Sequence, residues 1–250
     1  MQTKNGSSEV DSLYISAPVN ALVDGIYREN RTLAQIKEFG DFGLGTFNDL
    51  DGEMVLLGGV AYQITGTGQV SQPGDDVHSP FACVTFFREM TYDEPPAGAE
   101  SFSELMTLIE GILPSPNMMY ALWIDGDFEY VRTRSVPRQY HFRPLAEVTR
   151  DQKVFDVSGV SGTMAGFYTP EFMSSLNVPG VHLHFLSEDR TFGGHLLECR
   201  AVRLRIGVQI LRRLKMDLPA TLEYMTADFK SDKAKDLAKA ESNNPSSHKE

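Results

Sequence analysis

The sequence predicts a globular α+β chain that is rich in strand. Hydrophobic residues make up 41% of the 250 residues and charged residues 23%, which is typical of folded globular proteins. The 21 glycines and 13 prolines stand largely between short apolar runs, a distribution that indicates many turns and strands. A few segments instead repeat apolar residues at helical spacing, so helices are expected beside the sheets.

Two short helices are predicted near the N-terminus. Residues 1–12 are polar, and we expect them to form a flexible tail. Residues 19–27 place apolar side chains at helical spacing and predict the first helix. Thr32 and Gln35 form a capping-box pattern that predicts the start of the second helix, and Gly40 suits its end.

A meander of short strands is predicted next. An Asp-Gly pair at 51–52 and a Gly-Gly pair at 58–59 are typical of tight turns between hairpin strands. The segment 81–87 (FACVTFF) is apolar throughout, so it is expected to be a strand buried on both faces. Its cysteine, Cys83, and the second cysteine, Cys199, lie far apart in apolar runs, and we expect both to be reduced, buried thiols.

A helix and a hairpin are predicted in the middle of the chain. Ser101 and Glu104 form another capping-box pattern, and the apolar spacing after them predicts a helix. The segment ALWI-DG-DFEYVRTRSV is expected to be a hairpin with the Asp-Gly pair at 125–126 at its tip. Pro137 and Pro144 bracket a connection that leads toward a second subdomain.

The C-terminal part of the chain is predicted to contain three strands. Residues 162–168 are strand-like, and Pro170 suits the first position of a short helix after them. Two further strands, 181–186 and 195–206, flank a polar loop. Residues 231–250 are polar and are expected to form a tail.

The formal net charge of −11 disfavours two classes of partner, because nucleic acid and anionic membranes both select basic surfaces. No apolar run approaches the ~20 residues that a membrane-spanning helix needs. The first residues also lack the apolar core of a secretory signal. We therefore expect a cytoplasmic protein that binds a small molecule and neither nucleic acid nor membrane.

Three histidines stand within one stretch of sixteen residues, GVHLHFLSEDRTFGGH (180–195). His182 and His184 are two apart on a predicted strand, so their side chains leave the same face. The glycine pair at 193–194 permits a tight return of the chain. If His195 lies opposite His184 across the hairpin, all three imidazoles converge on one point.

Three neutral imidazoles on a divalent metal leave coordination positions free, which is typical of catalytic rather than structural sites. Imidazole suits zinc, copper, iron and nickel, and we take zinc as the first choice. One alternative is the H-x-H-x3-E pattern of cupin barrels, in which Glu188 replaces His195 as a ligand of an oxygenase metal. Another is a protein that binds metal or a ligand without catalysis.

Four other charged residues are candidates for substrate or proton chemistry. Glu53 follows the turn at 51–52, and Glu241 lies in the polar tail. Arg132 and Arg134 are expected to share one strand face, and either guanidinium could hold a substrate carboxylate. Residues of these types are also common on solvated surfaces, so the pattern leaves the choice open.

Four stretches together resemble the alpha-acetolactate decarboxylase family: GDFGLGTFNDLDGE, SPFACVTFF, VRTRSV and GVHLHFLSEDRTFGGH. The resemblance implies an α+β fold of two closely packed subdomains with mixed, largely antiparallel sheets and the active site between them. We place a β-rich subdomain at 13–148 and a metal-binding subdomain at 149–230, between the tails 1–12 and 231–250.

The resemblance also implies the chemistry. It implies a carboxy-lyase that converts 2-acetolactate to acetoin and CO2 through a metal-bound enediolate, in the acetoin and butanediol pathway. It further implies a homodimer and a zinc ion, with the ligands His182, His184 and His195. The family's catalytic residues match Glu53, Arg134 and Glu241, although the ending KAESNNPSSHKE differs from the acidic, glycine-containing ending common in the family.

Overall fold

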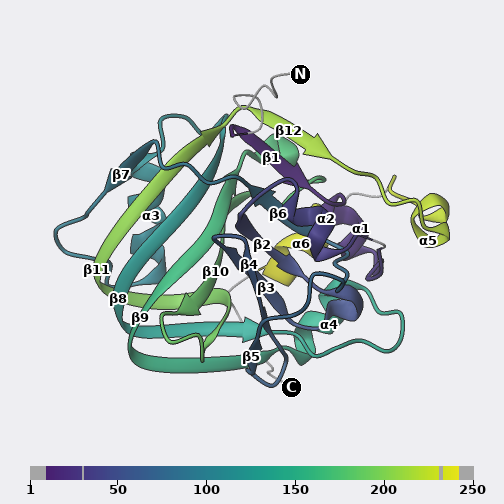
Figure 1. The fold of residues 1–250 in the computed structure, drawn as a ribbon, viewed down its shortest axis with the longest axis horizontal. Helices are drawn as coiled ribbons and strands as arrows, with labels where there is room; N and C mark the ends of the chain where they lie inside the picture. Colours follow the sequence, from purple (N-terminus) through teal and green to yellow (C-terminus); the bar gives the residue numbers. More distant parts are fainter. Residues whose placement is uncertain (1–9, 30, 231–232, 242–250) are drawn as a thin grey trace, which may run out of the picture.

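The computed structural model describes residues 10–29, 31–230 and 233–241. Two β-sheets lie against each other, with helices at their margins (Figure 1). Residues 1–9 of the tail predicted at 1–12 lie outside the described residues, and Ser12 already begins the first strand. The predicted α+β class with two largely antiparallel sheets is confirmed, and one of the two sheets is mixed.

The first sheet has seven strands in the order β12-β1-β6-β2-β3-β4-β5. Only β1 and β12 pair in parallel; the other neighbours are antiparallel. The turns predicted at 51–52 and 58–59 connect β2 to β3 and β3 to β4. The strands are β1 (Ser12–Ile15), β2 (Phe42–Thr46), β3 (Glu53–Leu57), β4 (Val60–Ile64), β5 (Val70–Ser71), β6 (Ala82–Thr85) and β12 (Arg213–Met216).

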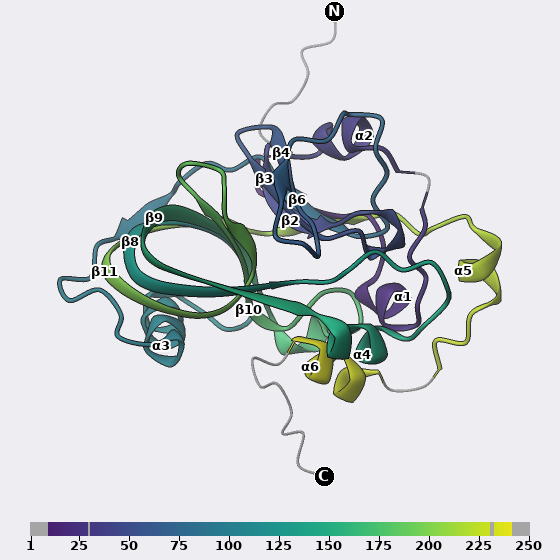
Figure 2. The ribbon, with the colours of Figure 1, turned by 90° about the horizontal axis from the view of Figure 1, so that it is seen from below.

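The second sheet has five antiparallel strands in the order β10-β9-β8-β11-β7. Because β10 also pairs with β11, four of these strands close into a ring, and Figure 2 shows their strong curvature. The strands are β7 (Thr91–Asp93), β8 (Met119–Ser135), β9 (Lys153–Thr169), β10 (Gly180–Ser187) and β11 (Gly193–Leu211). β7 and β8 therefore join a sheet whose other strands come from beyond residue 149.

The helices are short, apart from α3, and side chains cap several of them. The Thr32–Gln35 capping box is present at α2, and the Ser101 hydroxyl accepts the Glu104 N–H at α3. The helices are α1 (Val19–Val23), α2 (Leu33–Lys37), α3 (Phe102–Ile112), α4 (Leu145–Val148), α5 (Leu222–Thr226) and α6 (Ala234–Glu241). Within the described ranges, none of them is both long and apolar enough to cross a membrane.

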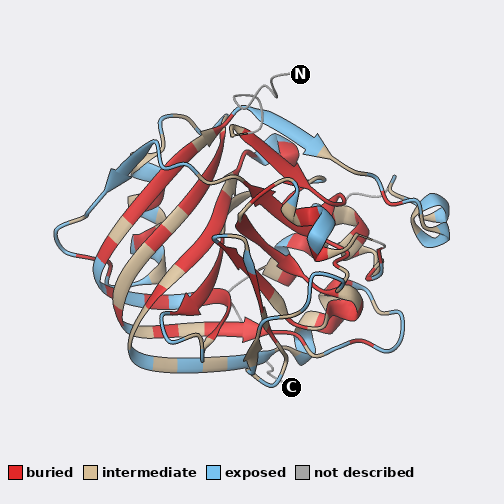
Figure 3. Cartoon of the chain, viewed as in Figure 1, coloured by how far each residue is buried: buried red, intermediate tan, exposed pale blue. Residues whose placement is uncertain are grey.

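The core lies where the two sheets meet, and Figure 3 shows buried residues concentrated there. Phe42 of the first sheet packs on Trp123 and Phe167 of the second, with ring centroids 5.3 and 6.0 Å apart. Each aromatic pair of this kind adds about 0.5–1.5 kcal/mol beyond the burial of its area. A second hydrophobic cluster lies between α3 and the five-stranded sheet, and α3 contributes the fully buried Leu105 and Ile109 to it.

The hairpin predicted at 125–126 is wrong, because β8 runs without a turn from Met119 to Ser135. The strand pairs with β9 and β11 on both sides of this Asp-Gly pair. The Asp125 carboxylate accepts hydrogen bonds from the Trp123 indole (2.9 Å) and the Thr163 hydroxyl (2.7 Å). Long-range pairing therefore outweighs the local turn preference of Asp-Gly.

Part of the predicted polar tail folds onto the body of the protein. Residues 234–241 form α6, whose Leu237 and Ala240 are buried in the core near α1 and α4. Just before the helix, the Lys233 ammonium lies 2.6 Å from the Asp24 carboxylate. The hydrophobic contacts and this ion pair bring the C-terminal helix to the junction of the two sheets, where the candidate site lies.

Candidate active site

The hairpin β10–β11 brings the three histidines together as predicted. His184 pairs with His195 across the two strands, and His195 in turn pairs with Arg134 of β8. Gly194 makes this close approach possible, since it has φ +134° and a Cβ there would lie 2.5 Å from the Arg134 carbonyl oxygen. The predicted register is confirmed, and it places three imidazoles and one guanidinium at one point.

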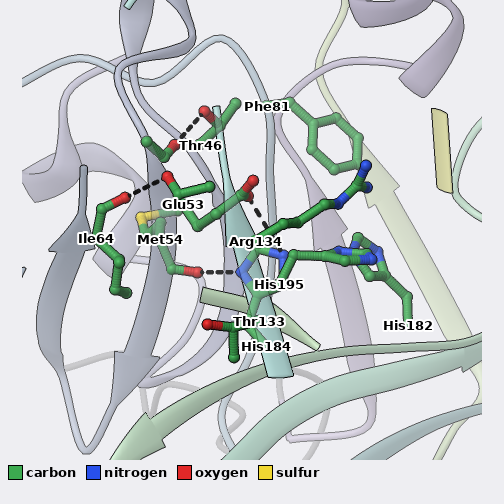
Figure 4. Close-up of polar contacts among 12 residues, drawn as sticks. Thr46, Glu53, Met54, Ile64, Phe81, Thr133, Arg134, His182, His184 and His195 are labelled. Atoms are coloured by element: carbon green, nitrogen blue, oxygen red, sulfur yellow. Dashed lines mark hydrogen bonds and ion pairs between the residues drawn. The ribbon is translucent and has the colours of Figure 1, made fainter. Parts of the chain in front are cut away.

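The three imidazoles form a compact cluster (Figure 4). Their ring centroids are 4.9–5.4 Å apart, and one ring nitrogen from each lies within 4.8 Å of the others. His184 and His195 are buried, and His182 is half-buried. Such a cluster of nitrogen donors could hold one metal ion.

The protonation of the imidazoles suits a metal. Burial lowers the pKa of His182 and of His184 to about 3 and that of His195 well below its usual value, so all three are neutral at pH 7. His184 Nδ1 lies 2.8 Å from the Met54 carbonyl oxygen. Because a carbonyl only accepts, Nδ1 carries the proton and Nε2 keeps a lone pair for a ligand. This donor set fits a divalent metal that prefers imidazole.

Glu53 reaches the cluster from the first sheet. Gly52 turns the chain with φ +87°, where a Cβ would lie 2.1 Å from the Ile64 carbonyl oxygen, and Glu53 then begins β3. The Glu53 carboxylate is 3.6 Å from His184 Nε2. Burial raises the pKa of Glu53 to about 8, against the opposing effect of Arg134. Without a metal, burial therefore favours the protonated form of Glu53 at neutral pH.

Arg134 extends from β8 into the same pocket, and its side chain is 5% exposed. Its Nη1 donates to the Gln152 side-chain oxygen (2.8 Å) and to the Ala240 carbonyl oxygen. Its Nη2 lies 3.4 Å from the Glu241 carboxylate, whereas its buried Nε has no partner among the described residues. A buried donor without a partner is costly and indicates a position for a ligand.

Glu241, the last residue of α6, closes the site from the C-terminal side. Its carboxylate lies 3.7 Å from His182 Nε2 and 3.7 Å from His195 Nε2. Burial raises the pKa of Glu241, and the positive charge of Arg134 opposes that rise. The structure thus brings together all six residues that the sequence indicated: Glu53, Arg134, His182, His184, His195 and Glu241.

Two rival candidates lie elsewhere. The Arg132 side chain is 41% accessible and pairs with Asp156 (2.8 Å) and Glu198 (3.6 Å), so it does not reach the cluster. Glu188 is exposed in the loop between β10 and β11, and it is not part of the histidine cluster. The cupin-like ligand set therefore lacks its glutamate.

The rest of the pocket wall is largely apolar, and the sequence patterns had not indicated which residues form it. Thr46, whose hydroxyl donates to the Gly52 carbonyl oxygen at 2.7 Å, is a polar member of the wall. Gln152, the partner of Arg134, was also missed, since no local pattern marks it. The apolar lining residues are Val19, Leu22, Leu44, Leu50, Phe81, Val136, Leu145 and Val178.

Comparisons with known proteins agree with this geometry. Residues 13–231 match the family described as alpha-acetolactate decarboxylase. The chain is 39% identical to an alpha-acetolactate decarboxylase of Methanosarcina mazei, over 95% of this chain and 82% of that protein. It is 37% identical to one of Brevibacillus brevis, over 92% and 81%. The crystal structure of the alpha-acetolactate decarboxylase of Bacillus subtilis strain 168 superposes with a TM-score of 0.89 at 32% identity, covering 92% of this chain and 99% of that one.

Proposed function

The chain belongs to the alpha-acetolactate decarboxylase family, and from that premise we propose that it is a metal-dependent carboxy-lyase that converts 2-acetolactate to acetoin and CO2. The observation that carries the proposal is the convergence of three imidazoles, a buried carboxyl and a partly unpaired guanidinium in one pocket. We propose zinc as the metal and a homodimer as the assembly.

His182, His184 and His195 would hold the metal. When bound, the metal would supply a Lewis acid for the negative charge that develops as CO2 leaves. The Met54 carbonyl supports this role, because it keeps His184 in the tautomer with a free Nε2.

Arg134 would orient the substrate by its carboxylate. Two donors on one edge of a guanidinium match the two oxygens of a carboxylate. In this pocket Nη1 is already occupied, and the unpartnered Nε lies beside Nη2 on the other edge. That edge is the available place for the carboxylate that will be lost.

Glu53 would deliver the proton that completes the reaction. Breaking the bond to the carboxylate carbon releases CO2 and leaves its electron pair in an enediolate, which must gain one proton on carbon to become acetoin. The buried Glu53 carboxyl lies 3.6 Å from His184 Nε2, so in its protonated form it could give that proton and then recover it from solvent. A donor on one side of the pocket would make the acetoin chiral.

Glu241 and the apolar wall would complete the environment. The Glu241 carboxylate lies beside Arg134 Nη2 and two of the imidazoles, so it would balance the charge of the guanidinium and limit its orientations. The apolar lining would accommodate the two methyl groups of 2-acetolactate and exclude water from the enediolate.

The test is to incubate the purified protein with 2-acetolactate and measure acetoin and CO2. We expect equal amounts of both, loss of activity with a chelator, and recovery when zinc is restored. Acetoin formation that survives complete metal removal would contradict the metal-dependent mechanism. Metal binding without acetoin would instead support the non-catalytic alternative. Light scattering tests the assembly and should give twice the chain mass of 27.8 kDa.

A further inference from the structure

We propose that Gln152 is a positioning residue that turns the Arg134 guanidinium so that its Nε–Nη2 edge stays open for a substrate carboxylate. This inference rests on the function proposed above. It concerns a residue that has no local sequence signal and that reaches the site only through the fold.

The hydrogen-bond donors of Arg134 are unequally occupied. A guanidinium has five N–H donors: one on Nε and two on each Nη. Gln152 and the Ala240 carbonyl oxygen use both donors of Nη1. Nη2 makes one long contact of 3.4 Å with Glu241, and the buried Nε has no partner among the described residues. The unused donors therefore lie on the Nε–Nη2 edge.

The position of Gln152 makes it suitable as an anchor. It ends the short helical turn Thr149–Asp151 and directly precedes β9, so its backbone is held on both sides. Its side chain is the only one among the described residues that is within hydrogen-bond distance of Nη1. The other anchor, Ala240, belongs to α6 and is a backbone group.

The chemical type of the anchor matters as well as its place. The Glu241 carboxylate already lies 3.4 Å from Nη2, whereas the neutral amide oxygen of Gln152 accepts from Nη1 and adds no further negative charge beside Arg134. A carboxylate at the same place would form an ion pair with the guanidinium and compete with the substrate carboxylate. Glutamine at position 152 thus fixes the direction of the Arg134 guanidinium without adding a negative charge beside it.

Substituting Gln152 should therefore affect carboxylate ligands selectively. Gln152→Met keeps the length of the side chain and removes the acceptor. The probes are 2-hydroxyisobutyrate, which has the carboxylate and hydroxyl but no ketone, and acetoin, which has no carboxylate. We expect Gln152→Met to weaken 2-hydroxyisobutyrate binding by about tenfold, the scale of one hydrogen bond to a charged group, and acetoin binding by less than about twofold.

The kinetic readout should show the same split. KM for 2-acetolactate should rise about tenfold, while kcat changes by less than about threefold. Gln139→Met is the control: Gln139 is a buried glutamine outside the pocket whose amide donates to the Pro137 carbonyl oxygen (2.6 Å), and its variant should behave like wild type. Gln152→Asn, whose side chain is too short to reach Nη1, serves as the second variant. It should show the same weaker binding of 2-hydroxyisobutyrate and the same rise in KM.

Calorimetric binding separates this inference from the proposed function. If wild type binds 2-hydroxyisobutyrate and both Gln152 variants bind it equally well, the positioning role is wrong. Equal weakening of both probes would also overturn it, because a merely structural role predicts that result. If the wild-type protein makes no acetoin, the proposed function fails, whatever the Gln152 variants do.

Discussion

The site draws its groups from two regions that differ in how they are held. The long strands β8, β10 and β11 are paired on both sides near the site and supply Arg134, His182, His184 and His195. The eight-residue helix α6 supplies Glu241 and the Ala240 carbonyl, and it is attached by Leu237, Ala240 and the ion pair of Lys233 with Asp24. We infer that metal binding depends on the strands, whereas the setting of Arg134 also depends on α6.

The largest effect is expected on the strand side. His184→Ala removes one of three imidazoles, so we expect the metal content to fall from about one per chain to near zero. Turnover should fall by on the order of 10³-fold or more. Elemental mass spectrometry and the acetoin assay measure the two losses. His141→Ala, at an exposed histidine, is the control. Full metal content in His184→Ala would remove this residue from the ligand set.

Arg134 stands where the two regions meet, and its loss should separate metal binding from catalysis. Arg134→Ala should keep its metal and lose more than ~10²-fold in kcat/KM, because a preorganised charge at the substrate disappears. Arg132→Ala changes an arginine on the same strand that pairs with Asp156 outside the pocket, and it should leave kcat/KM near that of wild type. Equal losses in both variants would contradict the assignment of the site to Arg134.

The next effect is on the pH dependence of stability in the metal-free protein, and it comes from the ionisation of Glu53. Folding raises the pKa of Glu53 to about 8 by burial, so its contribution to stability is fully present below its ordinary pKa and is lost as the pH rises through 8. Glu53→Gln, which cannot ionise, should gain stability over wild type by about 1.4 kcal/mol per pH unit between pH 5 and 8. Urea unfolding in the presence of a chelator measures this difference.

The control for this series is Glu110→Gln, at an exposed position of α3. It should show no such growth of the stability difference with pH. A constant difference between Glu53→Gln and wild type across this range would show that folding leaves the pKa of Glu53 near its ordinary value.

The attachment of α6 should give the smallest effect. The Lys233–Asp24 pair is partly exposed, with side chains 21% and 19% accessible, so it should contribute at most about 1 kcal/mol. Lys233→Ala should lower kcat/KM less than about fivefold and leave the metal content unchanged. Asp24→Ala should match it, and the double variant should be no worse than either single one. Additive losses would mean that the two residues do not act as a pair.

The sequence predicted the strand side of this comparison better than the helix side. The alternation of His182 and His184 and the glycines before His195 define a hairpin face through local geometry, which sequence patterns report well. The sequence left open whether Glu53 and Arg134 lie near this face, because strands from different parts of the chain must meet to bring them there. The resemblance to the family supplied those two residues and Glu241.

No local sequence pattern could predict the contacts that α6 makes with the rest of the protein. Its sequence is polar apart from Leu237 and small residues, and the hydrogen bond from Arg134 to Ala240 joins residues 106 positions apart. Gln152 was missed for the same reason. The wrong hairpin at 125–126 shows the opposite error, in which a strong local turn signal lies inside a strand that its neighbours hold extended.

The most direct test of the three-histidine metal site is a crystal structure of the metal-loaded protein, with anomalous diffraction measured at the absorption edge of the metal that elemental analysis identifies. One anomalous peak per chain is expected, in contact with His182, His184 and His195, with no peak at this place in His184→Ala crystals. A peak at another place, or a metal surrounded by four protein ligands with no open position, would contradict it.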